Sequence, residues 1–172
     1  MRKLLKRLFR DSSGLAGIEF ALASTALTVG LLNGLEVARW SFQRMEVANA
    51  VHSATLAVWN ACDTKHLPAK TNCTGLGSAI STGISQTSLT IPTPTTTEGY
   101  YCVNGSGVLT KVADYTATKP TDCSAVGDST RSPGDYLLLT ATYTYTPLFG
   151  SGLTVGSLLT SNLTSTGYIR LQ

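Results

Sequence analysis

Charged side chains are scarce in this sequence, and the cations among them are unevenly placed. Charged residues make up 13% of the 172 residues, whereas about a quarter is usual in soluble domains. Five basic residues and one acidic residue give the first 14 residues a charge of +4, while the rest of the chain carries eight basic and nine acidic side chains. A nucleic-acid-binding surface needs cations spread over a folded face. The body of the chain therefore does not favour nucleic-acid binding.

Motifs for catalysis and cofactor binding are also missing. The sequence has no G-x-S-x-G turn, no phosphate-binding loop and no H-E-x-x-H helix. Its cysteines include no C-x-x-C pair, and His52 and His66 do not complete a metal-ligand cluster with them. We therefore expect no enzyme activity, no metal, no cofactor and no small-molecule substrate.

The cysteines instead indicate two disulfides formed in an oxidising compartment. All of them follow the apolar part of the chain, at Cys62, Cys73, Cys102 and Cys123. Four cysteines allow three pairings. Sequential pairing, Cys62 with Cys73 and Cys102 with Cys123, is favoured only because it closes short loops, and the other pairings stay open.

One long apolar run, residues 15–38, follows a basic leader at residues 1–14. Sixteen uncharged residues separate Glu19 from Glu36. A helix of 24 residues is ~36 Å long, enough to cross a hydrocarbon core of ~30 Å. The preceding cations predict one membrane span with a cytoplasmic N-terminus and a translocated C-terminal part.

Two ordinary membrane-targeting segments are the alternatives to a functional membrane helix. A secretory signal peptide has a shorter apolar core and a small-x-small cleavage site, and no such site ends this run before the charged EVARW stretch. A plain signal anchor explains the topology, but it leaves the acidic Glu19 without a purpose.

The helical pattern continues past the apolar run. Val47, Val51, Ala54 and Val58 recur at steps of three and four residues, and no proline occurs in residues 12–60. We expect one helix that ends near residues 60–62, with residues 15–38 in the membrane and residues 39–62 as an amphipathic continuation.

Polar residues near the end of the apolar run are predicted to be ordinary surface groups. Glu36 with Arg39, and Glu46 near Arg44, are interpreted as interfacial or solvated charges. Trp40 fits the aromatic belt at the outer membrane face.

Small residues within the run suggest helix packing. Gly30 and Gly34 make small-x-x-x-small steps that permit close approach of helices, and Asn33 has an amide that could hydrogen-bond between helices. The ordinary composition of a membrane helix explains these residues nearly as well.

Residues 63–172 predict a small disulfide-stapled domain. The stretch DYLLLTATYTYTP alternates apolar residues with threonines, as a half-buried strand does. Another strand is expected over residues 162–171, and YYCVNG with GVLTKVADYT predicts a hairpin about NGSG. LGSAISTGISQTSL predicts a short helix, and IPTPTTTEG an extended connector. The expected fold class is α+β, a long N-terminal helix packed on a small antiparallel sheet.

The residues around Gly14 carry a resemblance to a known family. RDSSG followed by LAGIEFALA resembles the class III signal peptide of type IV pilins, in which a prepilin peptidase cuts after the glycine. Cleavage between Gly14 and Leu15 would make Glu19 the fifth residue of the mature chain, with Phe20 after it. GLLNGLEVARWSFQRMEVANAVHSATLA, DYLLLTATYTYTPLFG and STGYIRLQ are similar to TadE-like pseudopilins of tight-adherence (Flp) pilus systems. TadF-like relatives stay open, and residues 63–134 carry no resemblance.

The resemblance implies a pilin-like fold and a function in assembly. It places the chain in the bacterial inner membrane with a periplasmic C-terminal domain, where it would work with prepilin peptidase, other pilins or pseudopilins and the pilus assembly platform. In a filament, Glu19 of one subunit would meet the Leu15 amine of its neighbour, although a helix N-terminus alone also favours an acid. The alternatives are a major filament subunit and a membrane-anchored periplasmic binding module or adhesin.

Overall fold

The computed structural model of the chain describes residues 13–62, 67–150 and 155–171. The chain forms two compact units. Unit 1 consists of Met1–Ser41 and Thr146–Thr160, and unit 2 of Phe42–Tyr145 and Ser161–Gln172.

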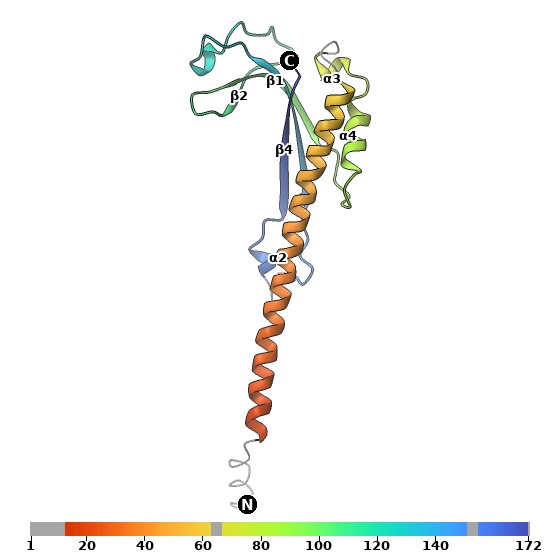
Figure 1. Cartoon of the computed structure of the whole chain (residues 1–172), viewed down its shortest axis with the longest axis vertical. Coiled ribbons are helices and arrows are strands. Elements are labelled where there is room, and N and C mark those ends of the chain that lie inside the picture. Colours follow the sequence, from red (N-terminus) through yellow and green to blue (C-terminus); the bar gives the residue numbers. More distant parts are fainter. Residues whose placement is uncertain (1–12, 63–66, 151–154, 172) are drawn as a thin grey trace, which may run out of the picture. The chain divides into compact units, whose positions relative to one another are not determined.

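One helix, α2, runs over Ser13–Ala61 and contributes to both units (Figure 1). Its length follows from the sequence, which offers no proline to interrupt the backbone hydrogen bonds and is rich in alanine and leucine, both strong helix formers. The prediction of a single helix that ends near residues 60–62 is confirmed.

Unit 2 contains a four-stranded antiparallel sheet in the order β2-β1-β3-β4. Its strands are β1 at Thr95–Val103, β2 at Leu109–Asp114, β3 at Gly134–Thr144 and β4 at Asn162–Arg170. Strands β1, β2 and β4 are labelled in Figure 1. The β1–β2 hairpin turns at Asn104, whose side-chain oxygen accepts the N–H groups of Ser106 and Val108 at 3.0 and 2.9 Å. Side-chain hydrogen bonds of this kind are typical of asparagine in turns, and the predicted hairpin is confirmed. The two predicted C-terminal strands are confirmed by β3 and β4.

The core of unit 2 lies between the C-terminal half of α2 and one face of the sheet. The helix buries residues at three- and four-residue steps, namely Val47, Ala50, Val51, Ala54 and Val58. The sheet contributes the alternate residues Leu137, Leu139 and Ala141 of β3, together with Leu163 and Ile169 of the edge strand β4. Strand β4 approaches α2 so closely that a Cβ on Gly167 would lie 2.8 Å from Cγ1 of Val51. The predicted α+β class, a long helix packed on a small antiparallel sheet, is confirmed.

Two short helices cover another side of α2 within unit 2. Helix α3 spans Ala69–Asn72 and α4 spans Leu76–Ile84. A Cβ on Gly83 would meet the backbone of Ala54 and lie 2.9 Å from the carbonyl carbon of Ser53. The α4 backbone therefore rests directly on the α2 backbone, and the predicted short helix is confirmed.

Both disulfides follow the sequential pairing. Cys62–Cys73 joins the end of α2 to the end of α3, and Cys102–Cys123 joins β1 to the 3-10 turn Ser124–Val126. Among the described residues no cysteine is free.

The prediction for residues 91–99 was wrong in part. Thr95–Gly99 do not form a connector, because they pair with β3 from Thr140 to Tyr136 and belong to β1. The prolines that precede these residues suggested a linker. Threonine is, however, a good strand former, and pairing with β3 makes these residues part of the sheet. Helix α3 was not predicted either, since its stabilising contact comes from a residue distant in sequence.

Candidate functional site

The segment proposed for processing begins α2. The Gly14–Leu15 peptide bond lies in the first turn of the helix, and Gly14 is exposed with open space where a Cβ would stand. Residues 1–12 of the leader lie outside the described residues. Glu19 and Phe20 are exposed, Phe20 with 76% of its surface accessible.

The N-terminal half of α2 presents large apolar side chains to its surroundings. None of the most apolar window of the helix is buried in the protein, whereas the core helix of a soluble protein would be mostly covered. The exposed side chains are Ile18, Phe20, Leu22, Leu27, Val29, Leu31, Leu35 and Val37. One helix of the described chain, Ala16–Ala61, is long and apolar enough to cross a membrane.

Several uncharged polar side chains of this helix half hydrogen-bond to the backbone of their own helix. Thr25 and Thr28 donate to the carbonyls of Ala21 and Ser24 at 2.7 and 2.8 Å, and the Asn33 amide donates to the Val29 carbonyl at 2.8 Å. Such internal bonds satisfy polar groups where no water is available. The helix is therefore compatible with lipid despite its serine and threonine content.

A clasp, defined as residues 146–150 and 155–160, connects β3 to β4 and binds α2 inside unit 1. Its strongest anchor is Glu36, whose side chain is completely buried. The backbone N–H of Leu148 lies 3.0 and 3.2 Å from the two carboxylate oxygens, and the N–H of Phe149 lies 3.4 Å from one of them. Backbone donors on a carboxylate form charge-assisted hydrogen bonds, which are stronger than neutral ones.

Three more side chains of α2 hold the clasp. The Asn33 side-chain oxygen accepts the Val155 N–H at 2.6 Å, Arg39 donates to the Thr146 carbonyl at 3.3 Å, and the Trp40 indole donates to the Thr160 carbonyl at 3.2 Å. Together with Glu36 they recur at three- and four-residue steps, so they share one face of the helix. This face fixes both ends of the clasp.

The clasp corrects the predictions made for Glu36 and Arg39. Glu36 is not a solvated charge, because the clasp backbone surrounds it, and Arg39 is only half-exposed and hydrogen-bonded to the clasp. The Trp40 indole is likewise bound to the clasp. Glu46 is half-buried and accepts the N–H and hydroxyl of Ser88 at 3.0 and 3.1 Å, so it anchors the segment after α4.

The predicted packing residues lie on the same helix half with different surroundings. A Cβ added at Gly30 or Gly34 would meet no other atom within 4 Å, so their faces are open to another helix. Asn33 uses its amide within the chain, as a donor to Val29 and an acceptor from Val155. A role for these residues between helices stays a prediction.

Two buried acids face the sheet core of unit 2. Glu98 accepts the N–H groups of Ala69 and Lys70 at 2.6 and 2.7 Å, which holds the first turn of α3. Asp135 is 2% exposed, and its Oδ1 has no hydrogen-bond partner among the described residues. Burial, followed by the negative charge of Glu98, raises the pKa of Asp135 to about 6, although Lys119 acts in the opposite direction.

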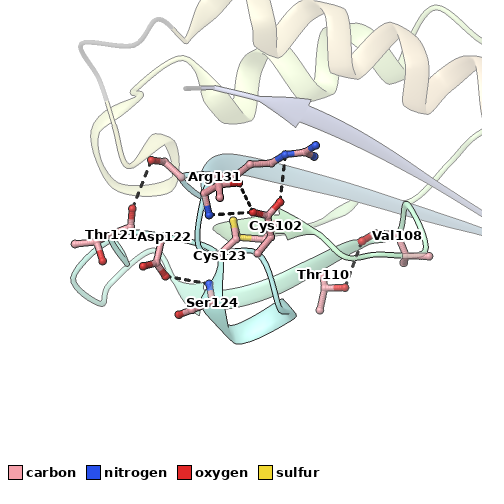
Figure 2. Close-up of a disulfide and its surroundings, with 11 residues drawn as sticks. Cys102, Val108, Thr110, Thr121, Asp122, Cys123, Ser124 and Arg131 are labelled. Carbon is pink, nitrogen blue, oxygen red and sulfur yellow. Dashed lines mark hydrogen bonds and ion pairs between the residues drawn. A yellow bond between two sulfur atoms is a disulfide. The ribbon is translucent and has the colours of Figure 1, made fainter.

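A hollow of about 390 Å³ lies beside the Cys102–Cys123 disulfide, whose surroundings are drawn in Figure 2. Tyr101 and Tyr136 line it, with their rings edge to face at 5.8 Å, and so do Arg131 and Arg170. Arg131 is ion-paired with Asp128 at 3.2 Å. The hollow therefore combines aromatic faces with cations.

Chemistry-bearing side chains are not gathered elsewhere in the described part of the chain. No group of three or more His, Cys, Asp or Glu residues that could hold a metal ion occurs there. His52 is exposed on α2, and His66 lies outside the described residues.

Comparison of the chain with family models, with curated proteins and with solved structures found no match. The assignment of a function therefore rests on the residues of this chain and their geometry.

Proposed function

We propose that this chain is a minor pilin or pseudopilin of a tight-adherence (Flp) type IV pilus, cut after Gly14 by a prepilin peptidase and active by assembly rather than by catalysis. One observation carries the proposal. An uncovered apolar helix with an exposed acid, Glu19, begins at the expected cleavage point and continues without a break into the core of a folded unit.

The continuity of α2 favours retention of the apolar segment in the mature protein. Cleavage by a signal peptidase after residue 38 would cut the helix and separate Asn33 and Glu36 from the clasp they hold. It would also leave the N–H groups of Leu148 and Phe149, which donate to the buried Glu36 carboxylate, without an acceptor. Cleavage after Gly14 removes only the basic leader and leaves every one of these contacts in place.

The charge distribution supports one orientation in the bacterial inner membrane. The five leader cations favour a cytoplasmic N-terminus by the positive-inside rule. Unit 2, which carries both disulfides, would then lie in the periplasm, where disulfides form and persist.

Glu19 supports a function in assembly, because an exposed carboxylate that lies within a membrane needs a partner to compensate its charge. It makes no hydrogen bond or ion pair within the described residues, and apolar side chains of α2 flank it. Cleavage would create a free amine on Leu15, one helical turn away. The amine of a neighbouring subunit is a suitable partner, since a charge-assisted hydrogen bond offsets much of the cost of an acid in lipid. Such pairing also sets the axial register between subunits.

The processing step is tested by the N-terminal residue of the protein isolated from its native membrane. A chain that begins at Leu15 in cells with prepilin peptidase, and at Met1 in cells without it, supports the proposal. Gly14→Lys should block cleavage and assembly, whereas Gly17→Ala, at another exposed glycine with open space around it, should be cut normally. Retention of Met1 in the presence of active peptidase would refute the proposal.

The share of the chain in sheared surface filaments separates a minor from a major subunit. A minor pilin or pseudopilin is present in trace amounts relative to the main filament protein, or only in the membrane fraction. A major subunit would instead form most of the sheared material.

A membrane-anchored binding module is the second candidate, and the hollow beside Cys102–Cys123 favours it. Tyrosine faces with arginines suit acidic saccharides. Under this alternative, Arg131→Ala with Arg170→Ala would abolish retention of the full-length protein on an array of acidic oligosaccharides, while its processing and assembly stayed normal. Under the assembly proposal the double variant matches the wild-type protein on the array.

A further inference from the structure

The clasp is unusual in composition for a loop between two strands. From residue 146 to residue 160 the sequence carries no charged side chain, although connecting loops almost always run over the protein surface. Large apolar side chains of the clasp are exposed instead. Leu158 is 82% exposed, Leu148 61% and Phe149 36%.

The clasp also contacts α2 over one short stretch of the helix, residues 33–40. Its contacts go to Asn33, Glu36, Arg39 and Trp40, which lie at the end of the apolar run and just beyond it. A span of about 20 residues fills the hydrocarbon core. If it starts at Leu15, Asn33 lies at its outer edge and Glu36 about 4.5 Å further along the helix, at ~1.5 Å per residue.

Several backbone groups of the clasp are hydrogen-bonded to side chains of the helix. The N–H groups of Leu148, Phe149 and Val155 donate to side-chain oxygens of Glu36 and Asn33. The carbonyls of Thr146 and Thr160 accept from Arg39 and Trp40, and the Leu158 N–H donates to the Val155 carbonyl at 2.8 Å. Non-helical backbone is tolerated at membrane depth only where its polar groups are paired in this way.

We propose that the clasp is a second membrane contact, a loop that inserts Leu148, Phe149 and Leu158 into the boundary between headgroups and acyl chains of the bilayer. The occupant of this surface is lipid, because the exposed apolar side chains of the clasp adjoin the apolar run of α2 within the same unit. Glu36 serves the insertion by accepting backbone donors that would otherwise face the lipid. The inference rests on the membrane span of α2 but not on cleavage or pilus assembly.

The depth of single side chains in a bilayer tests the proposal. A fluorescent amino acid, acridonylalanine, replaces Leu158 in the full-length chain, which is then placed in phosphatidylcholine nanodiscs. Nitroxides on the lipid headgroup, near the start of the acyl chain or deep within it quench the probe according to its depth. The same probe at Leu27 reports the apolar run of α2. At Val108, an exposed apolar residue (56%) beside the polar turn at Asn104, it reports a comparable side chain of unit 2.

We expect headgroup and shallow nitroxides to quench the Leu158 probe severalfold more than aqueous iodide does. The Val108 probe should show the opposite preference. The Leu27 probe should be quenched most by the nitroxide deep in the acyl chain. A Leu158 probe that behaves like Val108 while Leu27 reports lipid would overturn the clasp insertion and leave the membrane span intact. An aqueous Leu27 would overturn both.

A photo-crosslinking residue at Leu158 distinguishes lipid from a protein neighbour. Benzoylphenylalanine at this position in native membranes should form lipid adducts, seen as a mass increase of one phospholipid. Crosslinks to another protein chain in place of lipid adducts would assign the clasp to a protein interface and refute the proposal.

Discussion

The carboxylate of Glu36 accepts the backbone N–H of Leu148 at 3.0 Å, across 112 residues of sequence. The bond joins the end of the apolar run to the clasp, and Glu36 is completely buried there. A completely buried acid is costly unless hydrogen bonds compensate it. The clasp supplies those bonds, so the two elements depend on each other.

Replacement of Glu36 by Gln is expected to loosen the clasp. The amide keeps one acceptor oxygen but turns donor hydrogens toward backbone N–H groups, so at least one buried donor loses its partner, at a cost of about 1–3 kcal/mol. We expect a lower melting temperature in detergent, by about 2–4 °C per kcal/mol, and faster chymotrypsin cleavage after Phe149. An unchanged melting temperature together with unchanged cleavage would show that the Glu36 bonds do not hold the clasp.

Under the proposed function, Glu19 is the acid of α2 that is expected to act in assembly rather than in folding. It lies on the same helix, is exposed and has no partner within the described residues, so Glu19→Gln should leave the melting temperature and the clasp cleavage of the purified protein unchanged. In cells the variant should still be cut after Gly14 but fail to join other pilins, as measured by co-purification from membranes. Normal co-purification of Glu19→Gln would remove Glu19 from the assembly mechanism.

Gly83 and Gly77 offer a second matched pair, both within α4. A Cβ on Gly83 would meet the backbone of Ala54, which cannot move aside easily, whereas Gly77 has open space. Gly83→Ala should therefore destabilise unit 2 by about 1–3 kcal/mol through overpacking. Gly77→Ala should be neutral or stabilising by up to about 1 kcal/mol, since alanine is the better helix former. The measurement is the melting temperature of each variant in detergent. A melting temperature of Gly83→Ala equal to or higher than that of Gly77→Ala would contradict the close contact of α4 with α2.

The parts of the fold that follow local patterns could be predicted from the sequence. Helix α2 follows from the spacing of Val47, Val51 and Ala54 and from the lack of proline, and β3 from its alternation of apolar residues with threonines. In each case one residue type repeats with the period of a single element, and no partner is needed to recognise it.

The parts that depend on distant partners could not be predicted in this way. Helix α3 is held by Glu98, 29 residues after Ala69, and the clasp is held by residues more than 100 positions away. Glu36 looked like a surface charge because a local pattern does not show which backbone will cover it. The one available signal was the group of polar residues at 33, 36, 39 and 40, which share a helix face at the end of an apolar run.

Asp135 is expected to make the stability of unit 2 depend on pH. Its pKa is raised from 3.8 to about 6 by burial and by the negative charge of Glu98, and is lowered in part by Lys119. The folded state therefore binds a proton more tightly than the unfolded state, so protonation of Asp135 favours folding. Its contribution to stability should rise as the pH falls from 8 through 6 and level off below about 4, where the unfolded chain is also protonated.

Asp135→Asn should remove this dependence and stabilise the protein at pH 7.5 by about 1–3 kcal/mol, because a neutral amide needs no desolvation of charge. The measurement is the melting temperature of the full chain in detergent from pH 8 to pH 5. Asp114→Asn is the control, since the hydrogen bond from Lys111 holds the pKa of Asp114 below its usual value and outside this window. A wild-type melting temperature that does not rise between pH 8 and pH 5 relative to Asp135→Asn would show that the Asp135 carboxyl is already neutral, or solvated, at pH 8. If Asp114→Asn altered the slope as well, the pH dependence would belong to the general charge of unit 2 and not to the buried acid.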